Sequence, residues 1–267
     1  MKPLLLRLKT DPLGLLYNPS NYRLFINGSE LVPEIRRLKD LSDVVYDREF
    51  FSKTDKEIPL YFMYRGLSRD RDKALCKSFR LRFDVTIIPP IMLGEEYAKT
   101  LGHCHPEAQK GLTYPELYEV LQGQADFLLQ RWKRVQGAFF SGEIKDVMIV
   151  KAFEGERVLI PPNYGHIAIN PSGKALVLAN WVSDAFSSVY EPYKRRGGGA
   201  YFELSGGRLI PNPRYGHLPF ARLIRADELR IPPLPKSGSI YEAFIRQPDC
   251  LEFLNKPELL RDLTDIL

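Results

Sequence analysis

Apolar and polar residues alternate without exception from residue 79 to residue 87. The apolar positions are Phe79, Leu81, Phe83, Val85 and Ile87, and the polar positions are Arg80, Arg82, Asp84 and Thr86. Because successive side chains of a strand point to opposite faces, this pattern predicts a β-strand that is buried on one face only. Pro89 and Pro90 then predict the end of the strand or a bend in it.

Short apolar runs continue along the chain between residues 80 and 185. Gly, Pro, Ser and Asn separate these runs at intervals of roughly ten residues, and helical periodicity of useful length is missing. The runs occupy residues 117–123, 125–132, 146–153, 157–162 and 175–182. Many short strands at even spacing are typical of a β-sandwich or barrel, so we predict an all-β core.

The two ends of the chain have a different pattern. Residues 33–53 favour a helical or mixed structure, whereas residues 232–235 are typical of an extended linker. Ser239 and Glu242 have the spacing of a helix capping box, and a second apolar-periodic stretch follows Pro257. We therefore divide the chain into three parts. They are an amino-terminal extension (1–55), a central domain (56–216) and a carboxy-terminal extended arm with two short helices (217–267).

Composition narrows the classes of protein to consider. The 267 residues are 44% hydrophobic and 12% aromatic, with 38 Lys and Arg against 33 Asp and Glu, which excludes a disordered chain. No run approaches about 18 consecutive apolar residues, and the start of the chain lacks the apolar core of a signal peptide. We therefore expect no association with membranes. The net charge of +5 favours an anionic small substrate, but the dense basic stripes of a nucleic-acid binder are missing.

Cysteine usage bears on the compartment. Cys76, Cys104 and Cys250 are scattered along the chain and odd in number. This argues against a disulfide framework and for a reducing environment, so we expect a cytoplasmic protein.

Three of the four histidines occur in two segments with a common chemical logic. His103 and His105 alternate, so a strand at this point would place both side chains on one face. A hairpin would bring the strand of Glu116 alongside, and a later strand would add His166. Three imidazoles and one carboxylate that converge inside a barrel predict a divalent-metal site with open positions for substrate. A single histidine is more often structural or exposed, as we expect for His217.

Both histidine segments resemble the two sequence motifs of the cupin family. In the first motif a glutamate is separated from a glycine by six residues, as Glu116 is from Gly123. Four residues fall in the register of the second motif: Gly155, Pro161, His166 and Asn170. Asn163 stands where that motif has glycine, and asparagine tolerates a left-handed backbone. The resemblance implies a cupin double-stranded β-helix, which is a jelly-roll barrel. It implies as metal ligands His103, His105, Glu116 and His166.

The carboxylate ligand is either Glu116 or Glu119, which lie three residues apart and would face opposite sides of a strand. The spacing to Gly123 in the cupin motif selects Glu116. Cys104 lies between two inward-facing histidines, so its side chain is expected to point away from the metal as a small core residue.

Within the cupins, the chain resembles the cupin-type glucose-6-phosphate isomerases. The segments that carry this resemblance are residues 36–41, 100–106, 115–123, 127–130 and 161–170. The interval from Thr86 to His103 also matches, and the resemblance covers residues 20 to 216, more weakly near its end. The loop between His105 and Glu116 is longer than in well-known archaeal members. The carboxy-terminal arm has no counterpart in the short members.

The resemblance implies an enzyme of glycolysis and gluconeogenesis that interconverts glucose 6-phosphate and fructose 6-phosphate through a cis-enediol(ate). A divalent metal would polarise the carbonyl, and iron, manganese, zinc and nickel all suit the ligand set. Glu116 would act as the base. Tyr118, on the same face, would hydrogen-bond the base or a sugar hydroxyl, or would be a core aromatic. A hydride shift is the rival mechanism, and the family suggests a homodimer.

By the same resemblance, the substrate is held by Thr86, Thr100, Gly102 and Tyr190. This requires the polar face of the strand around Thr86 to look into the mouth of the barrel. Residues 194–196, followed by three glycines, would close over the phosphate or form a solvated basic turn. Two other functions stay open. One is a non-haem iron oxygenase with the same metal ligands, and the other is a non-catalytic sugar-phosphate-binding cupin.

Overall fold

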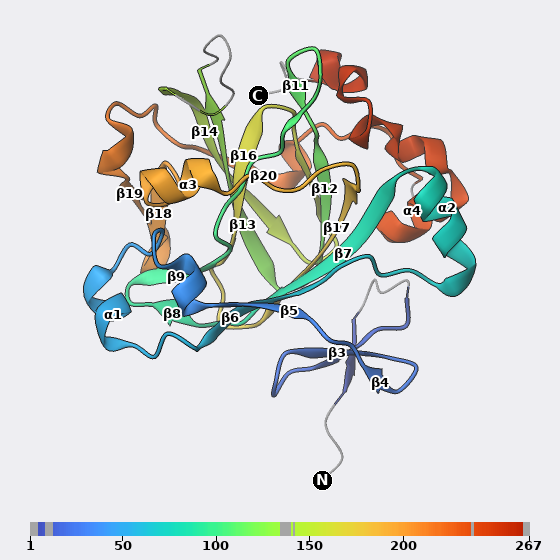
Figure 1. Ribbon diagram of the computed structural model, residues 1–267, viewed down its shortest axis with the longest axis horizontal. Coiled ribbons are helices and arrows are strands. Elements are labelled where there is room, and N and C mark those ends of the chain that lie inside the picture. Colours follow the sequence, from blue (N-terminus) through green and yellow to red (C-terminus); the bar gives the residue numbers. More distant parts are fainter. Residues whose placement is uncertain (1–4, 9–12, 134–139, 141, 236–237, 264–267) are drawn as a thin grey trace.

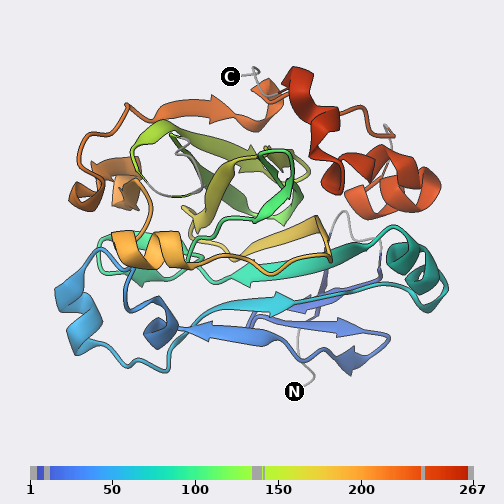
Figure 2. The same cartoon turned by 45° about the horizontal axis from the view of Figure 1, so that its top comes forward.

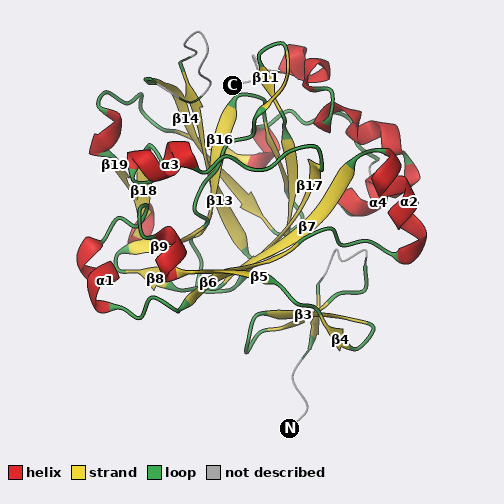
Figure 3. Cartoon of the chain, viewed as in Figure 1, coloured by secondary structure: helices red, strands yellow, loops and turns green. Residues whose placement is uncertain are grey.

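The computed structural model describes residues 5–8, 13–133, 140, 142–235 and 238–263. Strands dominate the described chain, and the short helices lie around them (Figures 1 and 3). Two large sheets form the core, and all their strand pairs are antiparallel except β14 with β20. The prediction of an all-β core is therefore confirmed.

The first sheet has six strands in the order β15–β12–β17–β7–β6–β5. These are β5 (Glu34–Arg37), β6 (Pro59–Tyr64), β7 (Leu81–Ile88), β12 (Glu116–Gln122), β15 (Arg157–Ile160) and β17 (Leu176–Ser183). The second sheet has the order β19–β18–β9–β16–β13–β14–β20, with β8 paired to β9. These are β8 (Met92–Leu93), β9 (Glu96–Lys99), β13 (Gln124–Trp132), β14 (Ile144–Phe153), β16 (Tyr164–Asn170), β18 (Tyr201–Leu204), β19 (Arg208–Pro211) and β20 (Arg222–Arg225).

The chain alternates between the two sheets. It runs from β12 in the first sheet to β13 and β14 in the second, returns to β15, and then crosses to β16 and back to β17. This winding of antiparallel strands between two facing sheets is that of a jelly-roll barrel, as predicted. Figure 2 shows the two sheets as layers.

Smaller elements surround the barrel. The amino-terminal sheet contains β1 (Leu6–Arg7), β2 (Leu16–Asn18), β3 (Arg23–Ile26) and β4 (Ser29–Glu30), and a hairpin contains β10 (Glu107–Gln109) and β11 (Leu112–Thr113). The α-helices are α1 (Arg48–Lys53), α2 (Lys73–Ser78), α3 (Glu191–Arg196) and α4 (Ile240–Arg246). The 3-10 helices are η1 (Leu38–Leu41), η2 (Asp70–Asp72), η3 (Ser205–Gly207), η4 (Pro213–Tyr215), η5 (Ala226–Glu228), η6 (Pro248–Leu254) and η7 (Pro257–Leu263).

The six-stranded sheet is covered on both faces by separate hydrophobic clusters. The inner cluster lies between the two sheets and includes Tyr118 and Phe127. The outer cluster joins the other face of the six-stranded sheet to both ends of the chain, with Tyr17 from β2, Trp181 from β17 and Tyr241 from α4. Trp181 Nε1 also donates a hydrogen bond of 3.0 Å to the carbonyl of Ile240. The terminal segments therefore form part of the core.

Strand β7 is the strand that the strict alternation predicts. Its apolar side chains, including Phe83, belong to the outer cluster. Its polar side chains Arg82, Asp84 and Thr86 line a pocket between the sheets. The prediction that one face of this strand is exposed was wrong, because the terminal segments cover the apolar face and the barrel encloses the polar one. The polar face does look into the barrel, as the resemblance required for Thr86.

Two other local predictions need correction. Residues 102–105 form no strand, because only isolated bridges join His103 to His166 and Cys104 to Val189. No hairpin brings β12 beside them either, since β12 pairs with β15 and β17. The residues between them form the separate hairpin β10–β11.

The carboxy-terminal segment is more than an arm with two short helices. Its described residues contribute β20, which pairs in parallel with β14, and then four short helices, η5, α4, η6 and η7. Ser239 caps α4 as predicted, because its side chain accepts a hydrogen bond from the amide of Glu242. The division of the chain at residues 55 and 216 stays a prediction. Among the described helices, none is long and apolar enough to cross a membrane.

Candidate metal centre and active site

Four side chains converge from three separate parts of the chain. Glu116 is the first residue of β12, His166 lies in β16, and His103 and His105 lie in the extended segment after β9. Two backbone hydrogen bonds join His103 to His166, with N···O distances of 3.1 and 3.0 Å. This bridge fixes the His103 segment against the second sheet, while Glu116 reaches the same point from the first sheet.

The geometry of these side chains fits a metal ion. One oxygen of Glu116, Oε2, lies 3.2 Å from His105 Nε2, 3.4 Å from His166 Nε2 and 3.9 Å from His103 Nε2. The four ligand atoms all lie within 4.8 Å of one another. Ligands about 2.1 Å from a shared cation have separations of this size. The four residues could therefore hold a metal ion.

Hydrogen bonds around the cluster leave the ligand atoms of His105 and Glu116 free, whereas His166 Nε2 lies within hydrogen-bond distance, 3.1 Å, of the Tyr118 hydroxyl. The Nδ1–H of His105 donates to the carbonyl of Tyr114 at 2.8 Å, so Nε2 keeps its lone pair. The amide of Asn180 donates to Glu116 Oε1 at 2.6 Å. Buried Glu116 Oε2 makes no hydrogen bond within the described part of the chain. A buried carboxylate oxygen without a donor is costly unless a cation satisfies it.

Burial tunes the charge states of the cluster. It lowers the pKa of His166 to about 4 and that of His103 well below its ordinary value, and the neighbouring histidines act in the same direction. Both rings are thus neutral, which is the form that binds metals. For Glu116, burial alone would raise the pKa, but the close contact with His105 outweighs it and lowers the pKa. The carboxylate is therefore ionised at neutral pH.

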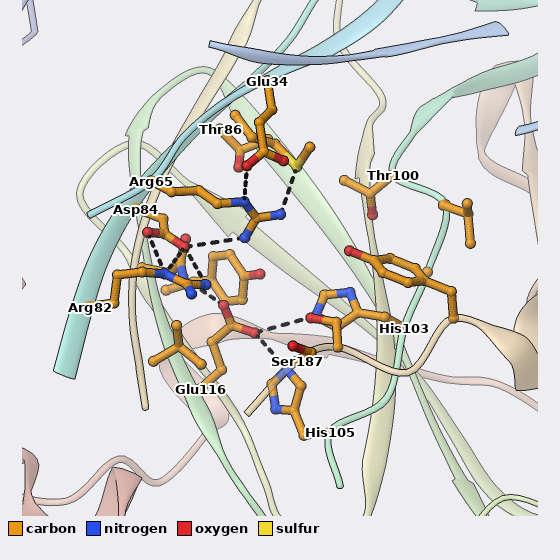
Figure 4. Close-up of a pocket in the computed structure, with 18 of the residues that line it drawn as sticks. Glu34, Arg65, Arg82, Asp84, Thr86, Thr100, His103, His105, Glu116 and Ser187 are labelled. Carbon is orange, nitrogen blue, oxygen red and sulfur yellow. Dashed lines mark hydrogen bonds and ion pairs between the residues drawn. The ribbon is translucent and has the colours of Figure 1, made fainter. Parts of the chain in front are cut away.

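A pocket of about 350 Å³ opens above the cluster, within the range of small-molecule sites. Figure 4 shows His103, His105 and Glu116 at one end and Glu34, Arg65 and Thr86 at the other. All the predicted substrate-binding residues line it: Thr86, Thr100, Gly102 and Tyr190. Tyr118 lines it as well, with its hydroxyl 3.1 Å from His166 Nε2.

Gly102 and Asn163 have the backbone conformations that their positions require. Gly102 has a φ of 88°, and a Cβ there would lie 2.7 Å from atoms of Ile167 and Tyr193, so only glycine fits. Asn163 has a φ of 70°, as expected for an asparagine in place of the motif glycine. It also exchanges two hydrogen bonds with Thr113, which fixes the hairpin before Tyr114.

Several pocket residues were missed by sequence reasoning. They are Glu34, Arg65, Arg82, Asp84 and Asn180. The sequence signal for Arg82 and Asp84 was present, because they lie on the same face of the strand as Thr86. Arg65 and Glu34 could not be found in this way, since the pairing of β5 and β6 with β7 places them in the pocket.

Other candidates lie outside the pocket. Glu119 points to the opposite face of β12 and accepts a hydrogen bond from the amide of Ile240 at 2.7 Å. Cys104 is buried in the inner cluster, as expected for a core residue. His217 is exposed. Residues 194–196 form no loop over the pocket but the end of α3, with Gly197 as its C-cap, and they do not line the site.

Comparison with known proteins agrees with this arrangement. The family model described as "Glucose-6-phosphate isomerase (GPI)" matches residues 35–217. The proteins named glucose-6-phosphate isomerase from Thermococcus gammatolerans and Thermococcus onnurineus are each 26% identical over 184 residues, covering 68% of this chain and 86% of theirs. The protein of the same name from Thermococcus litoralis is 27% identical over 153 residues, covering 57% of this chain and 70% of its own.

Among solved structures, recombinant oxalate oxidase in complex with glycolate matches part of the chain. It has a TM-score of 0.35 at 14% identity and covers 50% of this chain and 56% of its own. Oxalate decarboxylase from Bacillus subtilis has a TM-score of 0.32 at 15% identity and covers 48% of this chain and 27% of its own. The family model spans more than half of the chain and includes all four residues of the metal cluster. The chain belongs to the glucose-6-phosphate isomerase family.

Proposed function

We propose that the protein is a metal-dependent aldose–ketose isomerase that interconverts glucose 6-phosphate and fructose 6-phosphate. The observation that carries this proposal is the position of Glu116 Oε2. It lies within 3.9 Å of three imidazole nitrogens, without a hydrogen bond from any described residue, at the floor of a polar pocket. The identity of the substrate is inferred from membership of the family. The need for a metal is inferred from this oxygen.

The four ligands would hold one divalent ion: His103, His105, Glu116 and His166. Imidazole and carboxylate donors suit iron, manganese, zinc and nickel alike. When bound, such an ion polarises the substrate carbonyl and stabilises negative charge on the adjacent oxygen. Burial already keeps the rings of His103 and His166 in the neutral form that binds a metal.

The side chains themselves would move the proton. Isomerisation takes a proton from one of two adjacent carbons and returns it to the other, through a cis-enediol(ate). Glu116 is ionised and faces the substrate space, and Asn180 holds its other oxygen in place. Burial and the nearby Glu116 raise the pKa of Tyr118 well above its ordinary value. Tyr118 therefore stays protonated, so it can donate a hydrogen bond to Glu116 or to a sugar hydroxyl.

The far end of the pocket would receive the phosphate. Thr100 Oγ1 accepts a hydrogen bond from the amide of Ala168 at 3.1 Å, so its own hydrogen is left to donate into the pocket. Thr86 adds a second hydroxyl, and Gly102 allows the substrate to approach the backbone closely. Tyr190 borders the sugar space, with its ring centroid 5.7 Å from that of His103.

The charged lining favours this function over the two alternatives. An oxygenase with the same ligands typically takes an apolar or aromatic substrate, whereas Arg65, Arg82 and Asp84 make this pocket strongly polar. A non-catalytic sugar-phosphate-binding protein would not need an ionised, oriented carboxylate beside the metal position. Oxygen consumption by the metal-loaded protein would indicate the oxygenase. Turnover of the sugar phosphate would exclude the non-catalytic binding protein.

The test is a coupled assay for glucose 6-phosphate formed from fructose 6-phosphate. It is run on metal-loaded protein, after chelation, and after metal is added back, with metal content measured in parallel. We expect activity to follow metal content and to return with the added ion. Metal-loaded protein without turnover would refute the proposal, and so would full activity after complete removal of metal.

We also propose that the protein works as a cytoplasmic homodimer, as the resemblance implies. Strand β20 is the last strand of the eight-stranded sheet, and Leu223 on it is 64% exposed, as is nearby Phe220 at 96%. A sheet edge with exposed apolar side chains favours association with another chain. Light scattering tests this: a mass of twice 30.7 kDa supports the dimer, and a mass of 30.7 kDa refutes it.

A further inference from the structure

A row of polar side chains crosses the inner face of the six-stranded sheet. It begins at the metal cluster, where Tyr118 of β12 pairs with Asn180 of β17, and Asn180 pairs with Asp84 of β7. On the next strand Met63 pairs with Thr86, and on the edge strand Glu34 pairs with Met63. This row runs from the metal position to the position that we assign to the phosphate.

Two arginines meet on one carboxylate in the middle of this row. Arg82 Nε lies 2.9 Å from both oxygens of Asp84, and Arg82 Nη2 lies 2.9 Å from Oδ2. Arg65 Nη1 lies 3.6 Å from the same Oδ2. The amide of Gly66 also donates to Oδ1 at 2.9 Å. Asp84 thus neutralises Arg82 first, and Arg65 receives only its longer contact.

The remaining contacts of Arg65 are weak. Its Nε lies 3.2 Å from Glu34, whose side chain is 58% exposed, so solvent screens this ion pair. Its Nη2 donates to the sulfur of Met63 at 3.4 Å. A thioether is a poor hydrogen-bond acceptor. A guanidinium that faces the pocket therefore has one nitrogen with no good acceptor among the described residues.

The position of this nitrogen matches the proposed phosphate site. Met63, its present partner, is the register partner of Thr86, whose hydroxyl also lines the pocket. Figure 4 shows Arg65 between Glu34 and Asp84, with Thr86 beside Glu34. A guanidinium fork can donate two parallel hydrogen bonds to phosphate oxygens. Asp84 and Glu34 already offset the two positive charges of Arg65 and Arg82, so a phosphate would be held here by the donors of the guanidinium fork and not by an excess of positive charge.

We propose that Arg65 binds the phosphate group of the substrate and thereby sets the preference of the site for phosphorylated sugars. Nη2 exchanges the sulfur of Met63 for a phosphate oxygen, and Nη1 donates to a second one. Asp84 and Glu34 act as positioning residues that hold the guanidinium plane. This inference rests on the proposed function for the identity of the substrate, but the binding of phosphate can be measured without turnover.

The test compares Arg65→Met, Arg65→Lys and a control, Arg208→Met. Arg208 also pairs with one carboxylate, Glu95, but is 58% exposed and lies outside the pocket. We expect Arg65→Met to raise the KM for fructose 6-phosphate and the inhibition constant of inorganic phosphate by about tenfold or more each, with a much smaller change in kcat. Arg65→Lys should give intermediate values because it keeps the charge without the fork. Arg208→Met should match the wild type.

Other outcomes are also decisive. Unchanged KM and phosphate inhibition in Arg65→Met, or a loss confined to kcat, would overturn the role of Arg65. If Arg65→Met does not fold, Arg65→Lys decides alone, because wild-type phosphate affinity in that variant would contradict bidentate binding. If the wild type does not isomerise, calorimetry with inorganic phosphate on metal-loaded protein gives the answer. If the wild type binds phosphate and Arg65→Met does not, Arg65 belongs to an anion site although the proposed reaction is wrong. If the wild type does not bind phosphate, both the anion site and the proposed reaction are refuted.

Discussion

Asn180 and Glu116 form the hydrogen bond that orients the carboxylate in the cluster of candidate metal ligands. The Asn180 amide holds Oε1 at 2.6 Å, so that only Oε2 faces the three imidazoles. The two residues lie on adjacent strands, and Asn180 pairs in register with Tyr118, two residues after Glu116. The sheet register therefore determines which oxygen of the carboxylate meets the metal.

This relationship predicts the effect of replacing Asn180 by alanine. Partners of metal ligands typically contribute about 10- to 100-fold to metal affinity. We expect Asn180→Ala to weaken metal binding within that range, measured by competition with a chelator, and to lower isomerase activity at limiting metal. Metal affinity equal to that of the wild type would show that the cluster does not depend on this bond.

The two glutamates of β12 give a matched pair of variants. Glu116→Gln keeps a carbonyl oxygen that can bind metal weakly but removes the base, so we expect residual metal and no isomerisation. Glu119→Gln keeps an acceptor for the amide of Ile240 on the outer face, so we expect kcat and KM to be nearly unchanged. The measurement is the coupled assay with metal analysis. Equal loss of activity in both variants would mean that the carboxylate has been assigned wrongly.

The fate of the transferred hydrogen separates the two mechanisms. If Glu116 carries a proton between adjacent carbons, part of it exchanges with solvent, and product formed in deuterium oxide contains deuterium at the carbon that receives the hydrogen. We expect such incorporation, because the pocket opens to water and the carboxylate is ionised. The label is measured by NMR of the product. Product free of deuterium at that carbon would instead favour the hydride shift.

Glu119 makes stability depend on pH. Burial, the largest cause, raises its pKa from 4.5 to about 7, although the amide of Ile240 and Arg157 lower it. Between these pH values the unfolded chain releases the proton while the folded chain retains it, so the contribution to stability is full below pH 4.5 and is lost as pH rises to about 7. The free energies of unfolding of the wild type and of Glu119→Gln, measured by denaturant titration and plotted against pH, should converge or cross over this window. Parallel curves would contradict the raised pKa.

The carboxy-terminal helices should stabilise the fold without touching the chemistry. Phe244 is fully buried on the outer face, with its ring centroid 4.5 Å from that of Trp181. Phe244→Ala should lower the free energy of unfolding by about 3–5 kcal/mol. Leu259→Ala, in the same segment but 55% exposed, should change it by less than about 0.5 kcal/mol. Denaturant unfolding measures both, and the KM of Phe244→Ala at low temperature should equal that of the wild type. A large rise in KM would show that the helices shape the pocket.

Local patterns predicted the parts of the fold that depend on local chemistry. The alternation around β7 and the spacing of Ser239 and Glu242 identified elements because side-chain direction and capping follow from neighbouring residues. The histidines and Glu116 could be grouped because their spacing fits a known family motif. Geometry brings them together as that motif implies.

The parts of the fold and of the pocket that could not be predicted depend on contacts between residues distant in the sequence. The polar face of β7 could be assigned to the interior only once the terminal segments were seen to cover its apolar face. Arg65 enters the pocket through strand pairing, which leaves no mark in its own neighbourhood of the sequence. The prediction of a hairpin near His105 was wrong for the same reason. Nothing in the local sequence specifies that β12 pairs with β17 in the six-stranded sheet, away from the His103 segment.

The outer cluster has a practical consequence for shortening this protein. Tyr17 from one end and Tyr241 from the other shield the same face of β7 that carries Phe83. A chain trimmed to the segment shared with the archaeal relatives would expose that apolar face to water and would tend to aggregate. Its loss of activity would then reflect an insoluble scaffold, even with every ligand and every pocket side chain still encoded.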